Sequence, residues 1–143
     1  MGLVYAEVEL INGFDFLKAE AGELPEAEVR RMPVRILVES GCGTLAINEN
    51  IRNQLGLRGR ERRTMQMADA SVITLDIVGP VEIRFANRRS CLDAVVLPGD
   101  AEPLLGAIPM QDMDVDMDVL VDPQRHRLIV NPEHPILAGG LLK

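Results

Sequence analysis

Alternating apolar and polar side chains mark the amino-terminal part of the chain. The apolar positions recur at every second residue, at Val4, Ala6, Val8 and Leu10. A period of two predicts a half-buried strand over 4–10. Shorter apolar runs predict further strands over 34–38, 72–78, 81–85, 91–97 and 127–130, with Gly79-Pro80 and Ala86-Asn87 as breaks. The pattern therefore indicates a mostly β protein.

Helical signals are few and short. Asn48 is a suitable N-cap, Ile47, Ile51 and Leu55 share one helical face, and Gly56 is a natural stop. Pro25 is placed to begin another short helix, over 26–31. The polar stretch 12–31 around it is interpreted as a surface insertion. We therefore expect one or two short helices.

Composition narrows the class of protein. A length of 143 residues, 47% of them hydrophobic and 26% charged, predicts one folded domain over 1–143 with a sizeable core. A net charge of -7 and 3% aromatic residues argue against a nucleic-acid surface. The one local basic cluster is interpreted as a solvated loop, with phosphate contact as the alternative; it comprises Arg58, Arg60, Arg62 and Arg63.

Nothing in the sequence indicates a membrane protein. The longest apolar stretch, 136–142, is far shorter than the roughly 20 residues of a spanning helix. Glu7 and Glu9 interrupt the apolar region that a signal peptide would need. We therefore expect a cytoplasmic setting, in which Cys42 and Cys91 stay reduced.

The segment 36–42 places a carboxylate where chemistry is expected. Glu39 follows three apolar residues and directly precedes Ser40 and Gly41. A carboxylate in such a position is costly to bury unless it is paired or hydrogen-bonded. The small residues of 40–43 predict a tight loop that allows close backbone approach. Leu104-Leu105-Gly106 later repeats two aliphatics and a glycine, without the acid.

These two segments resemble the retropepsin-like aspartic proteases. That family has two aliphatics, Asp, Thr or Ser, Gly and a small residue, followed later by an aliphatic-aliphatic-Gly element, and the resemblance runs from about Val34 to Asn131. It implies a single lobe of the acid protease fold, a retropepsin-like closed β-barrel. It also implies catalytic roles for Glu39, Ser40 and Gly41, with Glu39 standing where the family has Asp. The substrate-binding positions that it implies are Cys42, Met67, Ala68, Asp69, Ala70, Leu104, Leu105 and Gly106.

The resemblance also gives the Asp69-Ala70 turn a role. Segments 65–68 and 71–75 would flank this turn. The resulting hairpin would be the flap that closes over a substrate. The alternative is an ordinary hairpin without a lid role. The family usually has glycine in the turn. Ala70 tolerates positive φ less well, so we expect either another turn type or a stiffer flap.

The chemistry of such a site requires two chains. Two carboxyls share a proton, one acting as base on a water and the other as acid, and this chain supplies only one motif. A homodimer is therefore expected, with Glu39 of each subunit facing the other across a twofold axis and Ser40 hydrogen-bonding across it. The apolar tail, 132–143, would dock across this axis or on its own chain. The extra methylene of glutamate moves the carboxyl by about 1.5 Å, and a 1 Å misplacement costs roughly a hundredfold in rate, so activity is expected to be reduced or lost.

Two further motifs are given structural interpretations. Cys42 is interpreted as a packed residue rather than a nucleophile, because neither His126 nor His134 lies in a supporting motif. The repeated Asp-Met-Asp-Val of 112–119 lacks the glycine and late glutamate of a calcium loop. We expect its Met and Val to face inward and its Asp to face water, with the repeat lengthening the family's short helix. No metal or cofactor is implied.

Three functions are consistent with the sequence. The first is a homodimeric endopeptidase, of full or reduced activity, acting on peptide or protein substrates. The second is a catalytically inactive dimer that binds extended peptides by strand addition. The third is a structural or assembly module in which Glu39 is a hydrogen-bonded loop residue.

Overall fold

The computed structural model describes residues 3–118 and 127–134. Its elements, in chain order, are β1 (Tyr5–Asn12), α1 (Gly13–Glu20), the 3₁₀ helix η1 (Glu26–Glu28), β2 (Arg31–Val38), β3 (Leu45–Asn48), α2 (Glu49–Leu55), β4 (Arg58–Gln66), β5 (Val72–Phe85), β6 (Arg88–Leu97), β7 (Leu104–Leu105), α3 (Ala107–Met113), β8 (Val115–Asp118) and β9 (Arg127–Val130). The prediction of a mostly β fold is confirmed.

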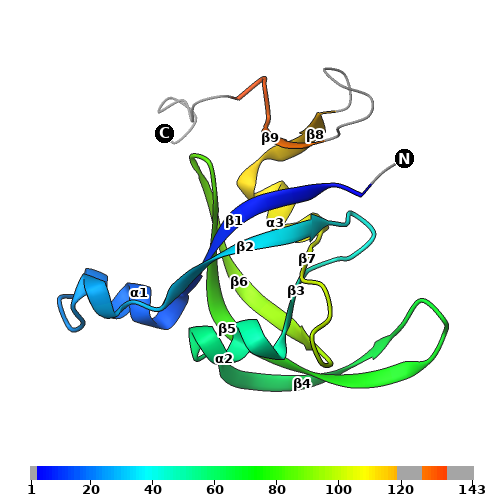
Figure 1. Ribbon diagram of the computed structural model, residues 1–143, viewed down its shortest axis with the longest axis horizontal. Coiled ribbons are helices and arrows are strands. Elements are labelled where there is room, and N and C mark those ends of the chain that lie inside the picture. The colour runs from blue at the N-terminus through cyan, green and yellow to red at the C-terminus, as the bar shows by residue number, and fades with distance from the viewer. Residues whose placement is uncertain (1–2, 119–126, 135–143) are drawn as a thin grey trace.

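One mixed sheet dominates the molecule (Figure 1). It has 7 strands in the order β1-β2-β7-β3-β6-β5-β4, and β1 also pairs with β5. This extra pairing bends the sheet into a partial ring, and β4 lies outside the ring as an edge strand. Strands β8 and β9 form a separate two-stranded sheet.

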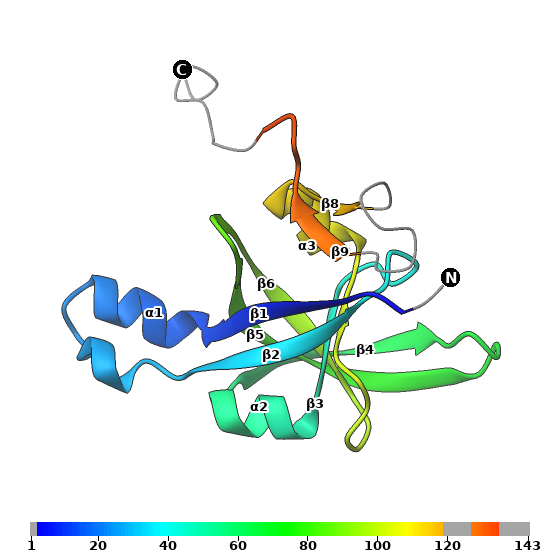
Figure 2. The ribbon, with the colours of Figure 1, turned by 45° about the horizontal axis from the view of Figure 1, so that its top comes forward.

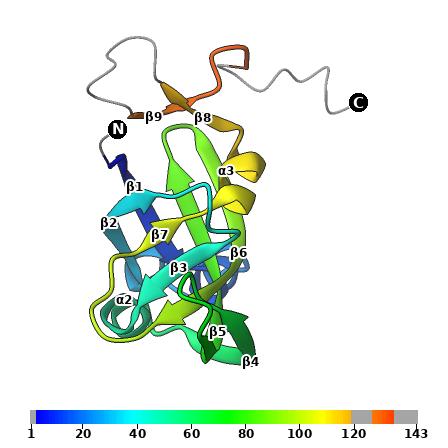
Figure 3. The ribbon, with the colours of Figure 1, turned by 90° about the vertical axis from the view of Figure 1, so that its right-hand side faces the viewer.

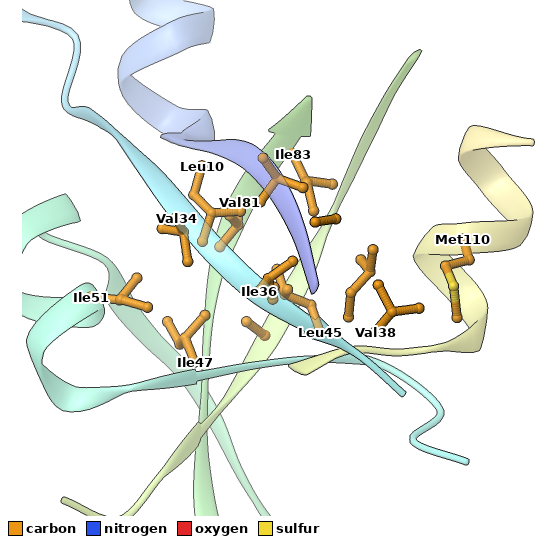
Figure 4. Close-up of a cluster of buried hydrophobic side chains, with 14 of the residues drawn as sticks. Leu10, Val34, Ile36, Val38, Leu45, Ile47, Ile51, Val81, Ile83 and Met110 are labelled. Carbon is orange, nitrogen blue, oxygen red and sulfur yellow. The ribbon is translucent and has the colours of Figure 1, made fainter. Parts of the chain in front are cut away.

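The core fills the inside of this ring. Leu10 of β1, Ile36 of β2 and Ile83 of β5 are fully buried, and Figure 4 shows their side chains gathered together. Burial of one such side chain contributes about 1.5–3 kcal/mol. The alternation along β1 places every second side chain in this core, as the sequence predicts.

Helix α2 forms where its capping residues predict it. The side chain of Asn48 accepts a hydrogen bond from the Ile51 amide at 2.9 Å, and Gly56 ends the helix with φ 61°. Ile51 and Leu55 are buried. Ile47, which is expected on the same helical face, lies instead in β3, pairing with Val96 of β6.

The prediction of one or two short helices is wrong, because the described residues form three short α-helices. The stretch 12–31 is also more than a surface insertion. Asn12 ends β1 and caps α1 by accepting from the Asp15 amide at 3.0 Å, and both side chains are buried. The expected helix over 26–31 is only the turn η1, because Arg31 already belongs to β2.

The arginine cluster, interpreted as a loop, lies in strand β4. All but one of the residues of β4 are exposed, so the strand has no apolar alternation, and its pairing with β5 defines it. The two strands expected over 72–78 and 81–85 are the single strand β5, in which a register shift against β6 between Val78 and Val81 accommodates Gly79-Pro80.

The Asp-Met-Asp-Val repeat does not lengthen a helix. Helix α3 ends at Met113, Asp114 adopts φ 55°, and the following residues form β8. The expected orientation is confirmed over 112–117 except at Asp114, which is half-exposed and accepts a hydrogen bond from Nδ2 of Asn131 at 3.0 Å. Met113 is buried and Met117 is packed against the core, whereas Asp116 is exposed. The predicted strand over 127–130 is β9.

The described residues contain no helix long and apolar enough to cross a membrane. They also contain no group of three or more His, Cys, Asp or Glu side chains arranged to hold a metal ion. The proposed docking of the tail beyond residue 134 lies outside the described residues.

Candidate acidic loop and hairpin

The two motifs of the sequence meet in space. Strand β7 runs parallel to β2, with Leu37 opposite Leu104, and antiparallel to β3, so it lies between them (Figure 3). The amide of Glu39 continues this ladder by donating to the Leu105 carbonyl at 3.0 Å. The acidic loop 39–43 is therefore held at the end of β2 by the second motif.

Glu39 is at the surface of this loop. Its side chain is exposed, and its Oε1 accepts a hydrogen bond from the Gly41 amide at 3.1 Å. The Cys42 amide donates to the Glu39 carbonyl at 3.0 Å and closes the turn. Ser40 and Gly41 are exposed as well. The carboxylate is thus supported by its own loop and stays accessible to solvent or to another chain.

Gly106 packs closely against the backbone of this loop from the other side. A Cβ atom on Gly106 would lie 2.2 Å from the Thr44 carbonyl oxygen and 2.5 Å from that of Cys42. No real Cβ makes such contacts, so position 106 requires glycine. Next to it, the Ala107 amide donates to the Cys42 carbonyl at 2.8 Å and the Ile108 amide to that of Gly43 at 3.2 Å. The start of α3 is therefore fastened to the acidic loop.

Cys42 has the surroundings of a packed residue. It is half-buried, and its Sγ donates to the Thr44 carbonyl at 3.3 Å. The imidazole of His134 contacts Asp114 at 2.9 Å instead. This geometry gives the thiol no base from His134, and His126 lies outside the described residues.

The β4–β5 hairpin is closed by the predicted turn. The Ala70 amide donates to the Met67 carbonyl at 3.0 Å, and the Met67 amide donates to that of Ser71 at 2.8 Å. Strand β4 ends at Gln66, so Met67 and Ala68 belong to the turn and not to a strand. Ala70 adopts φ 68°, the left-handed conformation that glycine prefers.

Asp69 stiffens this turn. Its carboxylate accepts hydrogen bonds from the Ser71 amide at 2.9 Å and from the Ser71 hydroxyl, and these bonds hold the pKa of Asp69 below its usual range. The hairpin tip and the acidic loop project at the same end of the molecule (Figures 1 and 2). The structure thus brings an acidic loop and a long hairpin to one end of the protein.

Sequence reasoning missed the pocket next to the acidic loop. A cavity of about 330 Å³ lies beside Ser40, between α3 and β8, and Met110, Gln111 and Met117 also line it. Met110 and Gln111 lie in α3, which begins directly after Gly106. A helix predicted from that glycine onward would have placed both residues near the acidic loop. The turn of the chain from α3 into β8, which completes the pocket, has no comparable signal.

Comparisons with known proteins add no assignment. No protein-family model matches the chain, and no curated protein matches it.

Proposed function

We propose that this chain is a homodimeric, retropepsin-like aspartic-type endopeptidase homologue in which Glu39 of two subunits forms the acidic pair. The observation that carries the proposal is the insertion of β7 beside β2, which sets Glu39 on a loop locked by Gly106. The partial ring of the sheet is consistent with the closed barrel that the resemblance implies. The cytoplasmic setting remains part of this proposal.

The exposed loop suits a site shared by two chains. In the proposed dimer, the two carboxyls share a proton; one takes a proton from water while the other protonates the carbonyl oxygen of the peptide. A twofold axis passing beside Glu39 would juxtapose both carboxyls, because Glu39, Ser40 and Gly41 are all exposed. An extended peptide would lie between this pair and the two hairpin tips. No cofactor takes part in the proposed reaction.

Glutamate at this position lowers the proposed activity. The longer side chain of Glu39 turns back onto the Gly41 amide, so its carboxylate is held by its own loop. Reaching the partner carboxylate would require breaking this bond or accepting an offset geometry. A displacement near 1 Å costs about a hundredfold in rate.

Proteolysis of casein tests the proposal. Wild type, Glu39→Asp and Glu39→Gln are compared between about pH 3.5 and 7.5, a range that spans carboxyl titration. We expect slow cleavage by wild type, faster cleavage by Glu39→Asp and none by Glu39→Gln. Light scattering should show a dimer for all three. Equal cleavage by wild type and Glu39→Gln, or a monomer throughout, would contradict the proposal.

A second candidate is a catalytically inactive dimer that binds extended peptides. Strand β4 favours it, because within the described residues β4 pairs only with β5, and its other edge is open to strand addition. Saturable peptide binding combined with an inert Glu39→Asp variant would support this function. A dimer that neither binds nor cleaves peptides would instead indicate an assembly module.

A further inference from the structure

A second cleft lies away from the acidic loop. Its volume is about 460 Å³, and it is bounded by α1, the end of α2, the start of β4 and the Gly79-Pro80 segment of β5. Arg30, which lines it, precedes β2, whereas Glu39 follows β2. At about 3.3 Å per residue, this 8-residue strand separates the two regions by roughly 25 Å. Figure 1 shows α1 and the acidic loop at opposite ends of β2.

Buried polar side chains organise the floor of this cleft. Asn12, which is 4% exposed, donates from Nδ2 to the Leu55 carbonyl at 2.8 Å and so ties α2 to the start of α1. Asp15, which is 6% exposed, accepts from Nε and Nη2 of Arg30 at 2.8 and 3.0 Å. The floor is therefore fixed in place before any ligand arrives, and the charges of Asp15 and Arg30 compensate each other.

Glycines keep the walls open. A Cβ on Gly56 would lie 1.8 Å from Nη1 of Arg30, and a Cβ on Gly79 would lie 2.3 Å from Oδ1 of Asp93. Both residues also have positive φ, 61° and 155°. A larger residue at Gly56 would displace Arg30, which lines the cleft, and one at Gly79 would displace Asp93, which pairs with Arg60 of the lining.

Two cations line this cleft beside the Phe14 ring, and the charge of one of them, Lys18, also helps to lower the pKa of Asp15. The Lys18 ammonium lies 5.7 Å, and the Arg58 guanidinium 5.6 Å, from the centre of the Phe14 ring. Neither forms an ion pair with any residue that the structure describes, whereas Arg60 pairs with Asp93 at 3.3 Å. Phe14 is 50% exposed. In a chain of net charge -7, this is a local surplus of positive charge around an accessible ring.

We propose that this cleft binds a small organic phosphate, with Lys18 and Arg58 holding the phosphate group and the Phe14 ring packing against the organic part. Arginine and lysine are the side chains that bind phosphate most strongly, through charge-assisted hydrogen bonds. The two negative charges of a phosphate group match the combined charge of Lys18 and Arg58. The volume falls in the range of small-molecule sites. The alternative of phosphate contact, raised for the arginine cluster from sequence, thus concerns Arg58, whereas Arg62 lies outside the cleft and pairs with Asp76.

Calorimetric titration with three probes tests this site. Adenosine monophosphate supplies both a phosphate and a ring, glucose 6-phosphate supplies a phosphate without an aromatic ring, and adenosine supplies the ring alone. We expect saturable binding of adenosine monophosphate, about tenfold weaker binding of glucose 6-phosphate and no binding of adenosine. Absence of saturable binding by both phosphates would overturn the proposal. Adenosine binding as tightly as adenosine monophosphate would overturn it as well.

Substitutions on one strand provide the matched control. Arg58→Gln and Lys18→Gln should each weaken binding of adenosine monophosphate about tenfold, whereas Arg62→Gln, farther along β4, should leave it unchanged. An equal loss in Arg62→Gln would show attraction to general surface charge and would refute the site. Glu39→Gln should bind adenosine monophosphate like wild type, so this result and the proteolysis result are independent. Circular dichroism confirms that each variant is folded.

Discussion

Gly106→Ala should destabilise the protein by displacing the backbone of the acidic loop. Gly106 has φ -92°, which alanine adopts without strain, so the substitution tests only the space available. The new Cβ would meet the Thr44 carbonyl oxygen at 2.2 Å, the Cys42 carbonyl oxygen at 2.5 Å and the Thr44 amide nitrogen at 2.7 Å. All three are backbone atoms, so no side-chain rotation relieves the contact.

The magnitude follows from two contributions. Overpacking of this kind costs about 1–3 kcal/mol. A shift of the loop also weakens the hydrogen bonds of 2.8 and 3.2 Å that join Ala107 and Ile108 to it, each contributing about 1 kcal/mol. We expect a loss of about 3 kcal/mol in the free energy of unfolding. For a chain of this length, that corresponds to a fall in Tm of about 9 °C.

Gly43→Ala is the matched control for this measurement. Gly43 belongs to the same loop, but a Cβ atom added there would have nothing within 4 Å of it. Its substitution should change the free energy of unfolding by less than about 0.5 kcal/mol. Urea denaturation of wild type and both variants supplies the comparison. The steric argument fails if Gly106→Ala stays within about 0.5 kcal/mol of wild type, or if Gly43→Ala costs as much.

The remaining predictions concern the ion pair between buried Asp15 and exposed Arg30, and the hairpin turn. Asp15→Asn should cost about 2 kcal/mol in urea denaturation at neutral pH, a value reduced for solvent because Arg30 is 50% exposed. Arg30 holds the pKa of Asp15 below its usual range. The stabilisation from Asp15 is therefore present above its unfolded pKa of about 3.9 and is lost as pH falls through the lower folded pKa. The free energies of unfolding of wild type and Asp15→Asn, plotted against pH, should thus converge in acid. Parallel curves would contradict this. Ala70 has φ 68°, a conformation that glycine adopts more easily than alanine, so Ala70→Gly should raise stability by up to about 1 kcal/mol in thermal unfolding. Ala68→Gly, in the same turn, should lower it. Equal effects of the two substitutions would refute strain at Ala70.

Elements whose local sequence agrees with their environment were predictable. The apolar alternation of β1 faces a real core, and α2 begins and ends at residues whose side chains or backbone cap it. The tight loop at 40–43 was predictable because its residues are small, and the bond from the Cys42 amide to the Glu39 carbonyl closes it. In each case the local preference and the tertiary contacts favour the same structure.

Other elements depend on contacts that a sequence pattern does not reveal. Helix α1 buries Asp15 and exposes Phe14 and Leu17, the reverse of the pattern used to recognise an amphipathic helix. Strand β4 is polar along its length and is defined by pairing with β5. Strand β3 was overlooked because Ile47 also suits the face of the following helix.

The smallest strand determines when the acidic loop can form. Strand β7 has only two residues, Leu104 and Leu105, yet it pairs with one edge of β2 and one edge of β3. During synthesis, a nascent chain that ends before residue 104 contains the whole segment 36–42 but leaves the facing edges of β2 and β3 unpaired. Such edges favour association with other chains, and pairing over a long sequence separation is slow. Glu39 can therefore acquire its native setting only after the chain has been made through Leu105.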